Sequence, residues 1–185
     1  MGNIIYISGG ISSGKSLFAE ELCYEKKEET VYIATAIAFD KEMIEKKEKH
    51  IERRKNKNWD TIEKYTGISN IIDSSKFKYK LALLDCITML VSNLIFEDES
   101  FDVYDKKNRE KMSEKIEEEI ASLLESISKS KCDFIIVSNE IGLGGISENS
   151  LTRYFSEICG KVNQKIASHS KEAYFVASGI AMKIK

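Results

Sequence analysis

The sequence contains no proline, and this absence limits how its turns are made. Proline is one of the two strongest breakers of regular structure, so glycines and polar clusters have to mark the boundaries between elements in this chain. Only ten glycines occur among the 185 residues. Glycine-rich stretches are therefore the first places to look for functional loops.

Closely spaced cysteines are also missing. The four cysteines lie far apart and form no C-x-x-C pair: Cys23, Cys86, Cys132 and Cys159. Such spacing is neither a zinc motif nor the framework of a small disulfide-rich protein. It suits a reducing compartment, so we expect a cytoplasmic protein in which each cysteine serves as a small core residue.

Long apolar runs and an excess of one charge are absent as well. No apolar stretch approaches the roughly 20 residues of a membrane-spanning helix, so we expect no membrane span, and no signal peptide at the N-terminus. Lysine and arginine number 28 against 30 acidic residues, for a formal net charge of -2. This balance argues against a nucleic-acid partner. The length suits one domain, residues 1–185.

The most informative stretch that is present begins at residue 4. The apolar run Ile4–Ile7 leads directly into residues 9–16, and a helix-forming stretch follows at once. Residues 9–16 match the phosphate-loop pattern G-x-x-x-x-G-K-[ST] at every fixed position. They read Gly9-Gly10-Ile11-Ser12-Ser13-Gly14-Lys15-Ser16. The motif therefore has the strand–loop–helix setting that it requires.

This motif requires these residue types for chemical reasons. Its glycines let the backbone fold so that successive N–H groups point at one anion, and the following helix adds the positive end of its dipole. Lys15 can reach the β- and γ-phosphates, and the Ser16 hydroxyl can bind Mg²⁺. We therefore predict a nucleotide-phosphate site.

Apolar runs alternate with helical stripes along the rest of the chain. Strands are predicted at 31–35, 81–84, 134–137 and 174–177, and helices at 40–58, 88–96, 108–128 and 148–168, with a short helix near 68–74 and a tail after residue 179. This alternation predicts an α/β fold, a mostly parallel sheet with helices on both faces. With the phosphate loop, it predicts a P-loop NTPase of the RecA-like kind.

Further candidates lie at the carboxyl ends of predicted strands, where such sheets bind ligands. Thr35, Ala36, Ile37 and Ala38 follow the second strand. Asp85 ends the next buried strand, as a Mg²⁺-binding carboxylate would. The alternative is that it only caps the following helix, and the two roles are compatible.

His50 lies in a strongly basic helical segment together with Lys47, Arg53 and Arg54. Such cations would bind phosphate and would favour a neutral, nucleophilic imidazole. The alternative is an ordinary solvated helix face. For Asn163, on the polar side of a later helix, a solvated position is the default expectation.

Taken together, these stretches resemble the bifunctional adenosylcobinamide kinase / adenosylcobinamide-phosphate guanylyltransferases of cobalamin biosynthesis, over essentially the whole chain. The resemblance is carried by the phosphate loop, Leu84-Asp85-Cys86-Ile87-Thr88, Val137-Ser138-Asn139-Glu140-Ile141-Gly142-x-Gly144, Gly160-x-x-Asn163-Gln164 and Ser178-Gly179-Ile180.

The resemblance implies two reactions. ATP or GTP phosphorylates adenosylcobinamide, and GTP then transfers GMP to adenosylcobinamide phosphate through a guanylylated His50. It implies that Lys15 is catalytic and that Ser16 and Asp85 hold Mg²⁺. It makes Arg53, Arg54, Glu63 and residues 35–38 candidate nucleotide contacts, and it implies a homotrimer.

Two other functions fit parts of the sequence. One is a small-molecule kinase that has the phosphate loop but lacks guanylyl transfer. The other is a GTP-dependent switch protein, which is disfavoured because the chain has no Asn-Lys-x-Asp motif for reading guanine.

Overall fold

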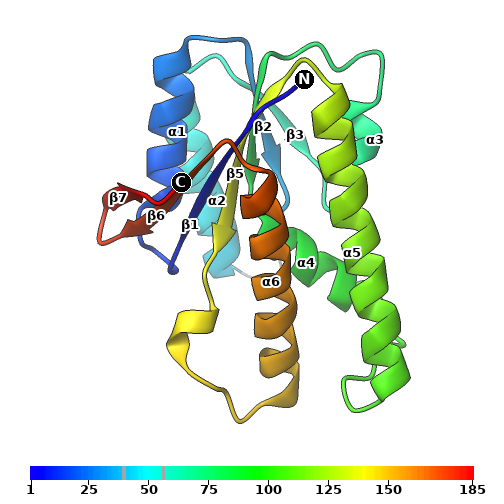
Figure 1. Cartoon of the computed structure of the whole chain (residues 1–185). Coiled ribbons are helices and arrows are strands. Elements are labelled where there is room, and N and C mark those ends of the chain that lie inside the picture. Colours follow the sequence, from blue (N-terminus) through cyan, green and yellow to red (C-terminus); the bar gives the residue numbers. More distant parts are fainter. Residues whose placement is uncertain (39–40, 56) are drawn as a thin grey trace.

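One sheet with the strand order β3-β2-β4-β5-β1-β6-β7 forms the centre of the computed structural model, which describes residues 1–38, 41–55 and 57–185, with the side chains at positions 42, 43, 46 and 50 excepted (Figure 1). All neighbouring strands are parallel except β6 and β7. The strands are β1 Ile4–Gly9, β2 Thr30–Ala34, β3 Asp60–Glu63, β4 Leu81–Asp85, β5 Asp133–Asn139, β6 Glu172–Ala177 and β7 Ile180–Lys183.

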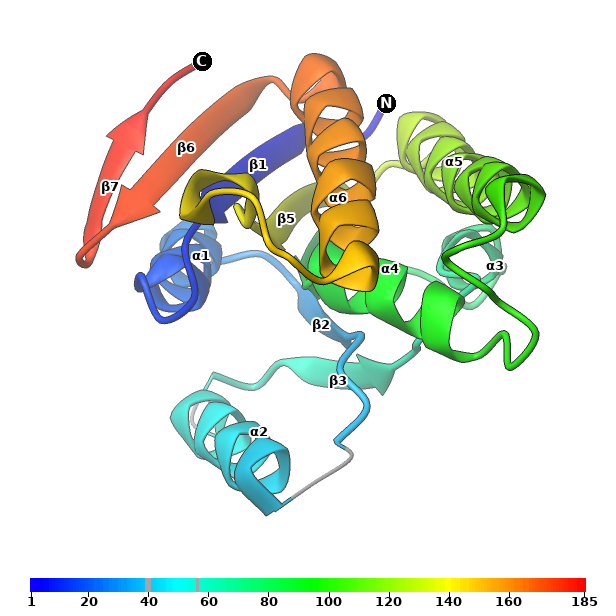
Figure 2. The same cartoon turned by 90° about the horizontal axis from the view of Figure 1, so that it is seen from below.

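Helices cover both faces of the sheet, as the sequence predicts (Figure 2). Helices α1 and α2 lie on one side, and the remaining α-helices lie on the other (Figures 1 and 2). Their bounds are α1 Lys15–Lys26, α2 Lys41–Arg54, α3 Ser69–Ile72, α4 Ile87–Phe96, α5 Lys106–Lys129 and α6 Ser150–His169, with a 3₁₀ turn η1 at Gly142–Gly144. The predicted α/β fold is confirmed.

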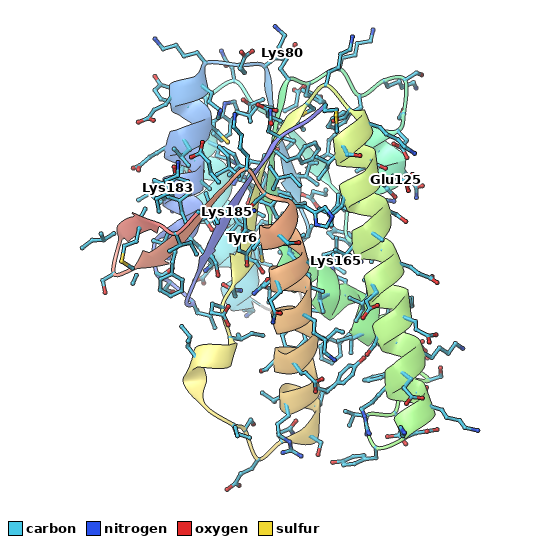
Figure 3. The ribbon with its side chains drawn as sticks, in the orientation of Figure 1. Tyr6, Lys80, Glu125, Lys165, Lys183 and Lys185 are labelled. Carbon is cyan, nitrogen blue, oxygen red and sulfur yellow. The ribbon has the colours of Figure 1, made fainter. Side chains whose placement is uncertain are left out.

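The strands read as continuous apolar runs because both of their faces are buried. In β4, Leu81 and Leu83 pack on the α1 side, whereas Ala82 and Leu84 pack under α3 to α6. The same alternation in β1 places Tyr6 in the deep interior (Figure 3). Burial raises the pKa of this tyrosine to about 12.

The end of the chain is not a tail, and this prediction from the sequence was wrong. Residues Ile180–Lys183 form β7, antiparallel to β6. Ser178 and Gly179 both have positive φ, 52° and 79°, as a tight two-residue hairpin turn requires. Across the hairpin, the Lys183 ammonium lies 2.9 Å from a Glu172 carboxylate oxygen (Figure 3 labels Lys183).

A buried polar network fixes the carboxyl ends of the central strands. The Ser138 hydroxyl at the end of β5 donates to Asn163 Oδ1 over 2.6 Å, and Asn163 Nδ2 donates to the Asn139 carbonyl over 3.1 Å. Thr88 Oγ1 accepts from the Asn139 N–H over 2.7 Å. Asn163 is 6 % exposed, so the expectation of a solvated position was wrong. Its partners lie on β5, outside its own helix.

In the described part of the chain, no helix is both long enough and apolar enough to cross a membrane.

Replacing Asn163 with Leu tests this network. The substitution leaves the Ser138 hydroxyl and the Asn139 carbonyl without their partner, so we expect the free energy of unfolding to fall by about 1–3 kcal/mol. Urea denaturation measures the change. Lys161→Ala is the matched control on α6. It removes an exposed ion pair with Glu157, and it should cost less than about 0.5 kcal/mol. Equal losses in the two variants would contradict the network.

Candidate active site

The phosphate loop connects β1 to α1 at the carboxyl edge of the sheet (Figure 1). A Cβ added to Gly9 would lie 2.4 Å from the Val176 carbonyl oxygen, so no other residue fits there without movement. Gly14 has φ of 97°, which favours glycine, and Ser12 also has positive φ, 57°. Helix α1 begins at Lys15, directly after Gly14. The predicted strand–loop–helix arrangement is confirmed.

Lys15 extends over this loop. Its ammonium donates to the Gly10 carbonyl over 2.8 Å, and the residue is 7 % exposed. Burial lowers the pKa of Lys15, and the nearby Asp85 opposes that effect. Ser16 lies in the first turn of α1.

The turn between β6 and β7 packs against the phosphate loop. The Gly179 N–H donates to the Ser13 carbonyl over 2.8 Å, and a Cβ on Gly14 would lie 3.1 Å from Gly179 Cα. Ile11, in contrast, is 78 % exposed at the tip of the loop. The hairpin that the sequence did not predict therefore supports one side of the loop.

Asp85 ends β4 and is held by Tyr32 of β2 and by Thr35, the residue that follows β2. The Tyr32 hydroxyl donates to Asp85 Oδ2 over 3.1 Å, and the Thr35 N–H donates to the Asp85 carbonyl over 3.3 Å. Thr35 is completely buried, and its hydroxyl oxygen bonds with both backbone groups of Cys86, at 2.7 and 2.8 Å. Thr35 thus joins β2 to β4, and the half-buried residues 36–38 follow it at the same edge.

The end of α2 lies against α1 and β2. The Arg54 guanidinium carbon lies 3.5 Å from the centre of the Tyr32 ring, and Arg54 is 8 % exposed. Arg53 Nη2 is 3.1 Å from the Glu20 carboxylate in α1. Both predicted phosphate-binding arginines therefore contact the protein itself. His50 belongs to α2, but its side chain lies outside the described residues.

Glu63, a predicted nucleotide contact at the end of β3, also faces α2. Its carboxylate lies 2.7 Å from the Lys47 ammonium and accepts a hydrogen bond of 2.9 Å from the Tyr65 hydroxyl. The hydrogen bond from Lys47 lowers the pKa of the Glu63 carboxyl most, and the hydrogen bond from Tyr65 lowers it further. The structure thus places the phosphate loop, residues 35–38 and Asp85 at one edge, with α2 fixed beside them.

Comparison with known proteins identifies the family to which this chain belongs. The model of the family described as "Cobinamide kinase / cobinamide phosphate guanyltransferase" matches residues 5–184. This chain belongs to that family. The bifunctional adenosylcobalamin biosynthesis protein CobU of Escherichia coli (strain K12) is 34% identical over 182 residues, covering 98% of this chain and 99% of the relative. The bifunctional adenosylcobalamin biosynthesis protein CobP of Pseudomonas aeruginosa is 31% identical over 179 residues, which cover 97% of this chain and 95% of that relative.

In this cobinamide kinase / guanyltransferase chain, two residues with several contacts, Glu20 and Tyr32, were not predicted as site residues from the sequence. Glu20 binds cations from the end of α2, and Tyr32 joins Arg54 to Asp85. Neither residue stands in the fixed positions of the phosphate loop. Only their positions in the sequence could have indicated a role in the site. Glu20 lies about one helical turn after the phosphate loop, and Tyr32 lies shortly before the carboxyl end of β2.

The Lys47–Glu63 pair predicts a specific pKa change. In Lys47→Met, the pKa of Glu63 should rise toward its ordinary value, because the principal hydrogen bond to the carboxylate is lost. Since the folded pKa is lowered, the pair stabilises the protein above the unfolded pKa, and this stabilisation is lost as the pH falls through the folded pKa. The free energy is small, because both side chains are about one-third or more exposed.

An NMR titration of the Glu63 carboxyl carbon measures this change. Lys49→Met, at an exposed position two residues along α2, is the control and should leave the pKa as it is in the wild type. An unchanged Glu63 pKa in Lys47→Met would refute the ion pair in solution.

Proposed function

We propose that one domain of this chain performs both reactions of its family at the phosphate loop. In the first, ATP or GTP phosphorylates the aminopropanol hydroxyl of adenosylcobinamide. In the second, GTP transfers GMP to that phosphate and yields adenosylcobinamide-GDP and pyrophosphate. The observation that carries the proposal is the buried Lys15 over the phosphate loop, with Asp85 and the end of basic α2 linked nearby through Tyr32.

The first reaction requires mainly positioning and charge neutralisation. The substrate hydroxyl oxygen forms a bond to the γ-phosphorus, the bond to the bridging oxygen breaks, and the hydroxyl proton is released. Backbone N–H groups of residues 9–14 and the Lys15 ammonium hold the phosphates. These groups stabilise the phosphates whether the γ-phosphorus or the α-phosphorus is attacked, so the same loop serves both reactions.

The residues predicted to hold Mg²⁺ have donor atoms that suit this ion. The Ser16 hydroxyl and the Asp85 carboxylate are oxygen ligands, which Mg²⁺ prefers, and Tyr32 orients that carboxylate. When bound, the ion neutralises negative charge on the phosphates. Mg²⁺ binding through one or two carboxylates and substrate phosphates needs no large acidic cluster.

The second reaction requires a nucleophile for the α-phosphorus, and His50 is the residue we propose. Its ring nitrogen bonds to the α-phosphorus while pyrophosphate leaves. An oxygen of adenosylcobinamide phosphate then attacks the same phosphorus and releases the histidine, so one difficult displacement becomes two. Arg53 and Arg54 follow His50 within one helical turn, and they supply positive charge for the phosphate oxygens.

Three further properties belong to the same proposal. Residues 35–38 and Glu63 contact the base and sugar of the nucleotide. The protein is cytoplasmic and assembles as a homotrimer. Sedimentation of the purified protein tests the oligomeric state.

His50→Ala tests the covalent intermediate. With Mg²⁺ and GTP, wild-type protein should gain one GMP, measured by intact mass, and the bond should be acid-labile. The variant should gain none, yet it should still phosphorylate adenosylcobinamide with ATP. His169→Ala is the control, because this second histidine lies at the end of α6, where its Nδ1 is 2.8 Å from the Lys165 carbonyl oxygen. Full guanylyl transfer by His50→Ala would remove His50 from the mechanism.

Lys15→Ala tests whether the two reactions share one phosphate site. Removing a buried cation at the phosphates should slow both reactions by about 100-fold or more. The rates of ADP formation and of pyrophosphate release measure the two effects. Lys26→Ala, at the exposed end of the same helix, is the control for the lost charge. A loss confined to one reaction would contradict a shared site.

A further inference from the structure

Glu20 is a charged residue in an unusual place. It lies in α1, four residues after Ser16, and it is 1 % exposed. A carboxylate that is removed from water is costly unless cations and hydrogen bonds compensate for the lost hydration. The burial of Glu20 therefore indicates that cations or hydrogen-bond donors surround its carboxylate.

The compensation comes from the end of α2 and the turn that follows. Arg53 Nη2 lies 3.1 Å and Arg54 Nη1 lies 4.0 Å from Glu20 Oε1, and the Lys57 ammonium lies 3.4 Å from Oε2. Among the described residues, one carboxylate on the phosphate-loop helix thus lies within 4.0 Å of three cationic groups from one other segment of the chain. The cations also lie where the negative end of the α2 dipole favours positive charge.

These contacts continue to the carboxyl edge of the sheet. Arg54 lies between Glu20 and the Tyr32 ring, and the Tyr32 hydroxyl donates to Asp85. The Tyr32 ring against one face of this guanidinium and the Glu20 carboxylate 4.0 Å from its Nη1 limit the movement of Arg54. The end of α2 is therefore fixed relative to both α1 and β4.

The described side chains of α2 make little apolar contact. Among the side chains of α2 that the structure describes, Arg54 alone is buried and Lys47 is half-buried. Ile44 and Ile51 are 46% and 47% exposed. Among the contacts of these described side chains, the Glu20 cluster at the end of the helix and the Lys47–Glu63 pair near its middle attach it to the rest of the protein.

We propose that Glu20 is a positioning residue for guanylyl transfer. His50 precedes Arg54 by four residues in α2, so the contact that fixes the end of the helix also sets where His50 stands relative to the phosphate loop. This inference rests on the proposed role of His50. The steps proposed above for phosphorylation of adenosylcobinamide use the phosphate loop, Ser16 and Asp85, and none of them uses a side chain of α2. Loss of Glu20 should therefore separate the two activities.

Glu20→Gln tests the proposal, because it keeps the size and hydrogen-bonding ability of the side chain and removes the charge. With α-labelled GTP and Mg²⁺, the rate constant for labelling of the protein at saturating GTP should fall about 10- to 100-fold, as expected for a misplaced nucleophile. ATP-dependent phosphorylation of adenosylcobinamide should stay within about twofold of the wild type, with an unchanged KM for ATP.

Three further variants make the result specific. Glu21→Gln removes the adjacent, exposed carboxylate and should change neither activity. Glu20→Asp keeps the charge and should recover part of the labelling rate. Lys57→Met removes one partner of Glu20 from outside α2. It should slow labelling in the same direction, which keeps the test open if Glu20→Gln does not fold by circular dichroism.

The outcomes separate this inference from the function on which it rests. If wild-type protein acquires no label, or if His50→Ala acquires as much as the wild type, the covalent role of His50 fails. If labelling depends on His50 but Glu20→Gln labels at the wild-type rate, the positioning role of Glu20 is wrong. Equal losses of both activities in Glu20→Gln would also overturn it, because they indicate general damage to α1.

Discussion

In the phosphate loop, backbone N–H groups rather than side chains have to face the anion. This constraint organises the carboxyl edge of the sheet. Gly9 is in register with Asn139 of β5 and Val176 of β6, and the Val176 carbonyl leaves no room for a Cβ. The Glu140 N–H donates to the Gly9 carbonyl over 2.9 Å. The end of β5, the end of β6 and the hairpin turn therefore have to be in place for the loop to keep its shape.

The sequence predicted most of the fold because buried parallel strands have a local signature. Runs such as Leu81–Leu84 are apolar at every position, which a strand between two layers of helices requires. Strand β7 lacks this signature, since it is an edge strand with mostly exposed residues. Its pairing depends on the free edge of β6 and on the backbone of Ser178 and Gly179. Composition within β7 therefore could not reveal it.

The same distinction explains which site residues the sequence could predict. The phosphate loop is contiguous, and its function follows from eight successive residues. Glu20 and Asn163 act through partners that are 24 to 37 residues away in the chain. A single sequence also cannot tell whether an arginine binds a ligand or a carboxylate of its own protein. Arg53 and Arg54 show the difficulty, because both were predicted as phosphate contacts and both lie against Glu20.

The two sides of the site are held by different forces, and this difference matches the two reactions. The sheet edge is fixed by backbone hydrogen bonds and by an apolar core, and the strength of these interactions does not depend on whether phosphate is bound. Helix α2 is held by guanidinium–carboxylate pairs, and a guanidinium offers a phosphate the same planar set of donors that it offers a carboxylate. Glu20 and a triphosphate are therefore comparable acceptors for Arg53 and Arg54. A rigid cradle suits a phosphoryl transfer that needs only positioning, whereas α2, which carries the histidine proposed as the nucleophile, is attached by ion pairs whose strength depends on the anions around them.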